Sequence, residues 1–255
     1  MKRFLTFFLS LLLFSCSSDD DELIKKVTLK FNFTQNWDGT DIEQSDISTT
    51  EFTNKLGTKL TIEQLRYLIS KITLTDGLGN TVKNENYNLI DISKSESLTA
   101  DFSEQISEGN YNLSMTFGFN NDDNQDGIYT DLNTASWNVP AMLGGGYHFM
   151  QLDGKFKNTD NELTNFNFHA IKAVDKSDPN NLQFENTFFS VDLGTISIKN
   201  NATIEIKMNV AQWFKNPNDW DLNDKNSNLM MDFDAQKLIA ANGDSGVFSL
   251  GKISQ

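Results

Sequence analysis

The segment Tyr111-Asn112-Leu113-Ser114-Met115-Thr116-Phe117-Gly118-Phe119 decides the fold class, because large apolar residues occupy every second position. A period of two places these side chains on one face of an extended strand and the small or polar residues on the other. Residues 23–33 show the same alternation, with apolar residues at Val27, Leu29, Phe31 and Phe33. Both segments are therefore predicted to be half-buried β-strands.

Aromatic and β-branched residues gather between Asn, Asp and Gly turns in further strand-like segments, at 68–74, 87–92, 146–156, 164–174, 183–193 and 202–209. Residues 34–58 are expected to form a loop, and residues 61–65 a helical turn capped by Thr61. Near the C-terminus, residues 210–214 predict one helical turn and residues 234–242 a short helix. We therefore expect an all-β fold: a two-sheet antiparallel β-sandwich with one or two short helices near the C-terminus, forming one domain over residues 23–255.

The N-terminus has the layout of a secretory signal over residues 1–15, with basic Lys2 and Arg3 before an apolar run too short to span a bilayer. That run ends in Leu13-Phe14-Ser15-Cys16, which resembles the lipobox of bacterial lipoproteins, and Cys16 is the chain's one cysteine. Residues 16–22 form an acidic tether, similar to the export signal of some surface lipoproteins. We expect a lipid on Cys16 that holds the protein in the outer membrane of a Gram-negative bacterium, on the cell surface or alternatively on the periplasmic face.

The charge balance excludes some partners. The chain carries 21 Lys and Arg against 35 Asp and Glu, a formal net charge of −14. Nucleic-acid binding depends on basic residues that neutralise phosphates, so no nucleic-acid partner is expected. The sequence has no nucleophile elbow, H-E-x-x-H or phosphate-loop motif, which favours a binding protein and not an enzyme. The expected contacts are the membrane, through Cys16, and a partner protein in the outer membrane.

Residues 120–131 contain D-x-N-x-D-G, the first half of a calcium-binding loop. In such a loop, oxygens at alternate positions converge on a hard cation and the glycine permits a sharp bend. The candidate calcium ligands are Asp122, Asn124, Asp126, Ile128 (through its carbonyl) and Asp131. The alternative is an Asn- and Asp-rich turn without a metal.

The two histidines of the chain, His148 and His169, lie in predicted strands on either side of a polar turn. A hairpin centred between Asn158 and Thr159 would pair them directly across the sheet. The same register buries Tyr147, Phe149, Phe166 and Phe168 on the opposite face and puts Met150 beside the histidines. Two imidazoles and a thioether suit a soft ion such as Cu(I), and imidazoles also suit Cu(II) or zinc. The candidate copper ligands are His148, His169 and Met150. The alternative is a histidine pair that only packs or hydrogen-bonds.

Four segments, in the same order along the chain, resemble motifs of the MbnP-like family: Leu65-Arg66-Tyr67-Leu68-Ile69-Ser70-Lys71-Ile72, Tyr87-Asn88-Leu89-Ile90-Asp91, Gly146-Tyr147-His148-Phe149-Met150-Gln151-Leu152-Asp153-Gly154 and Phe168-His169-Ala170. The resemblance implies a secreted or surface-attached β-rich protein. Some members resemble copper-binding surface proteins of methane-oxidising bacteria, in which histidines and an oxidised tryptophan hold copper. The resemblance therefore implies copper handling, for uptake or storage. The family's Trp-x-Trp before the Gly-Tyr motif is missing here, and the nearest tryptophan is Trp137.

A second interpretation comes from a different class of protein. The chain would be a calcium-stabilised β-sandwich that binds a glycan or a partner protein at the cell surface. Its binding platform would be an exposed tryptophan, Trp37, Trp137 or Trp220, because an aromatic ring offers a large apolar face to such a ligand. The metal content of the protein and the exposure of its tryptophans would distinguish this interpretation from that of a copper-binding protein.

Overall fold

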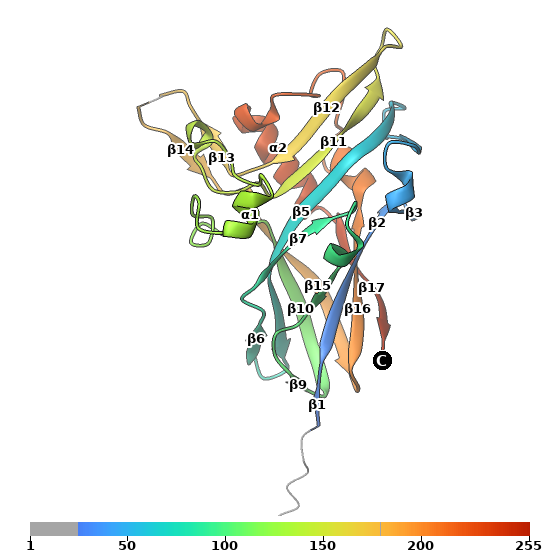
Figure 1. Ribbon diagram of the computed structural model, residues 1–255, viewed down its shortest axis with the longest axis vertical. Helices are drawn as coiled ribbons and strands as arrows, with labels where there is room; N and C mark the ends of the chain where they lie inside the picture. The colour runs from blue at the N-terminus through green and yellow to red at the C-terminus, as the bar shows by residue number, and fades with distance from the viewer. Residues whose placement is uncertain (1–24, 179) are drawn as a thin grey trace, which may run out of the picture.

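The computed structural model describes residues 25–178 and 180–255, so the signal segment 1–15, the tether 16–22 and Cys16 lie outside the described residues. The chain folds as two packed β-sheets (Figure 1). The path of the larger, eight-stranded sheet is β12 (Leu163–Ala170), β11 (Met150–Lys157), β5 (Lys59–Asp76), β10 (Gly109–Phe117) and β15 (Phe189–Ile198), with β4 (Glu51–Thr53), β6 (Thr81–Lys83) and β7 (Tyr87–Asp91) also paired to β5. The five-stranded sheet runs β17 (Phe248–Ser254), β16 (Ala202–Asn209), β2 (Leu29–Trp37) and β3 (Thr40–Ile42), with β8 (Thr99–Asp101) on β2.

Smaller elements complete the fold. Two short ribbons pair β1 (Lys26–Val27) with β9 (Ile106–Ser107) and β13 (Ala173–Asp175) with β14 (Gln183–Glu185). The helices are α1 (Thr130–Thr134), α2 (Phe233–Asp244) and the 3-10 turns η1 (Gln44–Asp46), η2 (Ser95–Leu98), η3 (Ala141–Leu143), η4 (Val210–Phe214) and η5 (Leu229–Met231). Among the residues with described positions, no helix is both long enough and apolar enough to cross a bilayer.

The predicted all-β sandwich is confirmed, as are the turn at 210–214 and the short C-terminal helix, which α2 extends at both ends. One pairing departs from the antiparallel pattern, because β16 runs parallel to β2 from Ala202 opposite Leu29 to Asn209 opposite Asn36. The long chain excursion between these strands makes a parallel arrangement possible. In the final segment, β17 joins the smaller sheet as a strand that the sequence did not predict.

Two local predictions were wrong. The segment 34–58 is not one loop, since β2 continues to Trp37 and β3 and β4 follow it. Residues 61–65 are not a helical turn but part of β5, whose alternate residues Leu60 and Ile62 are buried. Burying that alternating face against the second sheet outweighs a local capping signal, because propensity is a weak determinant beside tertiary packing.

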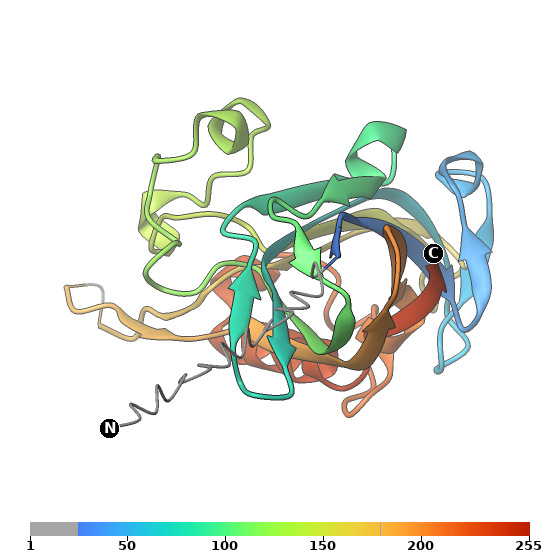
Figure 2. The same cartoon turned by 90° about the horizontal axis from the view of Figure 1, so that it is seen from below.

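The core lies between the sheets and is rich in aromatic rings. Phe117 of β10 stacks on Phe189 of β15 with ring centroids 4.9 Å apart, and Trp213 of η4 lies 5.2 Å from Phe117. Seen from below in Figure 2, the strands of both sheets curve around this shared interior. Large buried rings contribute most of the hydrophobic stabilisation in such a core.

The excursion between β10 and β11 carries α1 and η3 and returns to the sheet through three glycines with left-handed φ values: Gly144 (94°), Gly145 (65°) and Gly146 (76°). At Gly146 a Cβ would lie 2.5 Å from Oδ1 of Asn124, so only glycine lets that side chain approach. The same Asn124 oxygen accepts a hydrogen bond from the Tyr147 amide at 2.8 Å. The contacts of Asn124 with Gly146 and Tyr147 fix the backbone just before His148.

Candidate metal centre

The hairpin formed by β11 and β12 has a different register from the predicted one. Gln151 faces His169, and Leu152 faces Phe168, so the direct pairing of His148 with His169 was wrong. The reason lies in the turn: the side chain of Asn158 accepts hydrogen bonds from the amides of Asp160 and Glu162, which moves the centre of the hairpin towards residue 160. His148 consequently lies outside the paired part of β11.

His148 is buried, with 5% of its surface exposed. The backbone carbonyl of Trp137 accepts two hydrogen bonds from it, one from the amide and one from the ring. The backbone oxygen of Trp137 lies 3.0 Å from the His148 amide and 2.9 Å from its ring Nδ1. Because a carbonyl only accepts, Nδ1 carries the proton, and Nε2 of the neutral ring is left with a lone pair. Burial lowers the pKa of His148 to about 4, so the ring is neutral near pH 7.

His169 lies near the end of β12 with its side chain partly exposed, and Nε2 lies 2.8 Å from Oδ1 of Asp153 on β11. Burial alone would raise the pKa of Asp153, but the hydrogen bond and charge of His169, with help from Asn167 and Arg66, keep that pKa below its usual value. An ionised Asp153 accepts the Nε2 proton of His169, so a metal would bind this ring through Nδ1. A carboxylate that orients a histidine in this way is typical of metal sites.

The two imidazole rings meet although their predicted pairing was wrong. Their centroids are 5.4 Å apart and their planes lie at 81°, an edge-to-face arrangement. Met150 does not join them: it faces Ala170 and Tyr67, it is fully buried, and it belongs to the core cluster. The shifted register puts Met150 on the face opposite His169, which corrects its assignment as a copper ligand.

A different methionine contacts the histidines. Met230, in η5, places its Sδ 3.2 Å from Nε2 of His148. A cavity of about 290 Å³ opens beside this contact, lined by Asn167, His169, Asn228, Leu229 and Met230. Sequence reasoning missed Met230 because it lies far along the chain in a turn with no periodic pattern that links it to the hairpin.

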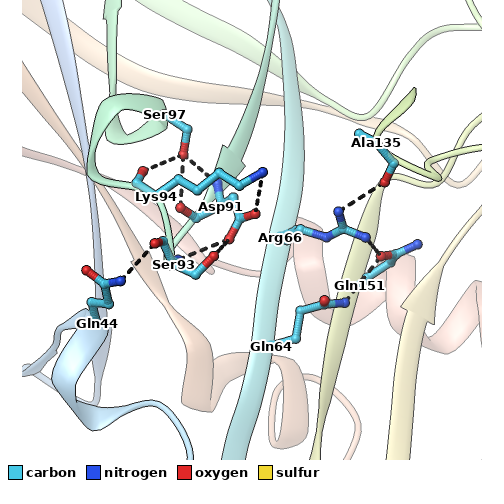
Figure 3. A network of polar contacts seen from close by, with 9 residues as sticks. All are labelled: Gln44, Gln64, Arg66, Asp91, Ser93, Lys94, Ser97, Ala135 and Gln151. Carbon is cyan, nitrogen blue, oxygen red and sulfur yellow. Dashed lines mark hydrogen bonds and ion pairs between the residues drawn. The ribbon is translucent and has the colours of Figure 1, made fainter. Parts of the chain in front are cut away.

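Behind the histidines a polar network joins three strands and the Trp137 ring. Arg66 of β5 donates to Gln151 and, at 3.2 Å, to the carbonyl of Ala135, as Figure 3 shows. Its guanidinium carbon also lies 5.0 Å from the centroid of the Trp137 ring, a cation–π contact. Gln64 connects Gln151, at 3.3 Å, to Asp153, at 3.0 Å. The network reaches His169 through Asp153 and holds the site on rigid strands.

Trp137 lies directly against His148, with ring centroids 5.6 Å apart. The indole is fully buried, and its Nε1 has no hydrogen-bond partner among the described residues. The tryptophan that the sequence placed nearest to the Gly-Tyr motif therefore belongs to the same site as the histidines.

Comparison with known protein families matches residues 26–232 to MbnP. The chain belongs to the MbnP family. Among solved structures, MbnP from Methylosinus trichosporium is similar, with a TM-score of 0.57 and 12% sequence identity, over 89% of this chain and 99% of that chain. At this identity the likeness shows a shared fold. No match was found among curated proteins.

In this MbnP family member two of the predicted calcium ligands have other partners. Asn124 is buried and binds the Tyr147 amide, while Asp131 accepts a hydrogen bond from the Tyr87 hydroxyl. Over the part of the chain that the structure describes, no three His, Cys, Asp or Glu side chains gather closely enough to hold one ion. Asp122, Asp126 and Asp131 therefore do not form such a group. Calcium binding stays a prediction from the sequence that these contacts do not favour.

The proposed tryptophan platform was also wrong. Trp37, Trp137 and Trp220 are buried, with exposed fractions of 7%, 0% and 1%. Each packs inside the MbnP fold, where a large ring contributes more free energy than it would at the surface. None of the three presents a face to a glycan.

Proposed function

We propose that this protein binds copper for uptake or storage, as a lipoprotein of the outer membrane, at a site formed by His148 and His169. One observation carries the proposal: each imidazole has one ring nitrogen against an oxygen acceptor, and among the described residues its other nitrogen has no partner that donates a proton. His148 is held by the Trp137 carbonyl and His169 by the Asp153 carboxylate. Metal-ligating histidines are oriented by such contacts, which fix the tautomer and aim the lone pair.

The donors present favour copper over a hard cation. Two imidazoles with a thioether nearby are soft to borderline ligands, whereas calcium and magnesium prefer several oxygens. The resemblance to copper-binding proteins of methane-oxidising bacteria points to the same metal. The proposed role is binding and not catalysis.

Copper retention by the two single-histidine variants tests this proposal. After loading the metal-free protein with copper and removing the excess, we expect the native chain to keep about one ion, and His148→Ala and His169→Ala to keep almost none, because each loses half of the imidazole donors. Elemental analysis of the desalted proteins measures the copper retained per chain. Asn165→Ala is the matched control, since Asn165 is exposed on the same strand as His169. Equal copper in all four proteins, or none in the native chain, would contradict the proposal.

Membrane attachment is proposed to depend on the lipid at Cys16. In Figure 1, β1 lies at the lower end of the molecule, whereas the turn of the β11–β12 hairpin extends towards the upper end. A tether that enters at β1 would therefore attach the protein at the end opposite this turn, with both histidines at the other end of the hairpin.

Replacement of the lipidated residue tests the attachment. In a Gram-negative host we expect the full chain to incorporate a radiolabelled fatty acid and to sediment with outer membranes, and Cys16→Ser to do neither, because a thiol is required for the thioether-linked lipid. Ser17→Ala is the control. A Cys16→Ser protein that remains in the outer membrane would contradict the proposal, and protease treatment of intact cells would distinguish the outer from the periplasmic face.

A further inference from the structure

The contact between Met230 and His148 lacks the proton that a hydrogen bond needs. Sδ of Met230 lies 3.2 Å from Nε2 of His148. A thioether has no proton to donate, and the proton of the neutral imidazole is on Nδ1, facing the Trp137 carbonyl at 2.9 Å. Two electron-pair donors therefore face each other across a short gap. Such a pair is satisfied by a cation placed where both lone pairs meet.

A second proton on His148 would be the simplest cation, but the surroundings disfavour it. His148 is 5% exposed, and burying an unpaired imidazolium is costly. The carboxylate in the site, Asp153, already accepts hydrogen bonds from His169, Asn167 and Gln64. The Arg66 guanidinium, which lies over the adjoining Trp137 ring, adds a positive charge nearby. A metal ion with soft character fits these two donors better than a proton.

The fold holds the Met230 segment in place beside β12. Asn228 precedes η5 at its N-cap in the left-handed region, with φ of 59°, which turns the chain towards the histidines. The side-chain amide of Gln236 donates to the carbonyls of both Leu229, at 3.0 Å, and His169, at 2.8 Å. The Asn167 amide also donates to the Asn226 carbonyl at 2.8 Å. These contacts tie the turn that carries Met230 to the strand that carries His169.

We propose that Met230 supplies a thioether as third ligand to the metal held by His148 and His169, and that it makes the site selective for Cu(I) over Cu(II) and Zn(II). The inference rests on the proposed copper function. Thioether sulfur is a soft donor that stabilises Cu(I), whereas two imidazoles alone suit Cu(I), Cu(II) and Zn(II) alike. The adjoining cavity leaves the ligand set open to solvent on the Met230 side.

X-ray absorption of the copper-loaded chain tests the ligand without any substitution at the site. We expect a sulfur scatterer in addition to imidazole nitrogens in the native Cu(I) protein. Cys16 is replaced by serine in every sample, so that Met sulfur is the one kind of sulfur left in the chain. Copper bound through nitrogens with no sulfur scatterer would overturn the role of Met230 and leave the histidine site standing. A native protein that binds no copper would instead overturn the proposed function.

A matched pair of methionine variants tests selectivity. Met230→Leu keeps the size of the side chain and removes the sulfur, and Met231→Leu makes the same change at the half-exposed neighbour in η5. We expect Met230→Leu to lower Cu(I) affinity by about tenfold or more, the scale on which lost metal-site contacts are felt, and to leave Cu(II) affinity nearly unchanged. Competition with chromophoric chelators for each oxidation state measures both. Equal losses for both ions, or equal losses in the two variants, would overturn the inference.

Discussion

Alanine at position 154 is expected to lower the free energy of unfolding by about 3 kcal/mol or more, because the added methyl group has no space. A Cβ on Gly154 would lie 2.0 Å from the backbone oxygen of Thr61 and 2.7 Å from the ring of Phe166. The pairing of β11 with β5 already carries a bulge at this point, so the two strands cannot simply separate. Asp153 faces Gln64 and Gly154 faces Ile62, which leaves Glu63 as the extra residue. Urea unfolding of the metal-free protein measures the loss.

Gly77→Ala is the control for that substitution. A Cβ on Gly77 would have nothing within 4 Å, and neither glycine has a left-handed φ, so the control makes the same change without steric crowding. The melting temperature of Gly154→Ala should fall by roughly 6–12 °C, given the size of the domain, while that of Gly77→Ala should stay near the native value. Similar unfolding midpoints for the two variants would mean that β5 and β11 move apart more easily than their packing indicates.

The faces of β12 could be predicted from sequence because side-chain alternation is a local property. Phe166 and Phe168 are buried as their spacing requires, and His169 points to the other side. The register across the hairpin could not be predicted in the same way, because it depends on how the turn is built. A single side chain, Asn158, organises that turn and shifts the pairing, which moved Met150 from the histidine face to the core.

The candidate site was partly predictable for a related reason. His169 lies in β12 and His148 lies just before the neighbouring β11, so their proximity survives an error in register, and their rings still meet. Met230 and Trp137 come from irregular segments that tertiary packing brings to the hairpin. No local pattern in the sequence encodes those contacts. The parallel pairing of β2 with β16 was hidden for the same reason, because it joins two ends of the fold.

Leucine at position 236 is expected to cost about 3–5 kcal/mol of stability, because it removes three hydrogen bonds to backbone groups, two of them buried, and leaves those groups without this partner. Gln236 is 1% exposed on α2. Its Oε1 accepts from the Ile171 amide at 2.8 Å, and its Nε2 donates to the carbonyls of His169 and Leu229 at 2.8 and 3.0 Å. Thermal and urea unfolding measure the loss, and Gln183→Leu, the same change on an exposed side chain, should show almost none.

The same substitution should also affect the metal centre, because Gln236 joins the strand of His169 to the turn of Met230 through two carbonyls. At temperatures where Gln236→Leu is still folded, we expect its Cu(I) affinity to fall while both histidines and Met230 remain in the chain. Such a loss would show that Gln236 positions the ligands without being one, since all donor atoms remain and only the contacts that hold them in place are removed. An affinity equal to that of Gln183→Leu would show that the turn keeps its place without this amide, and a native unfolding midpoint would show that the three backbone groups find other partners.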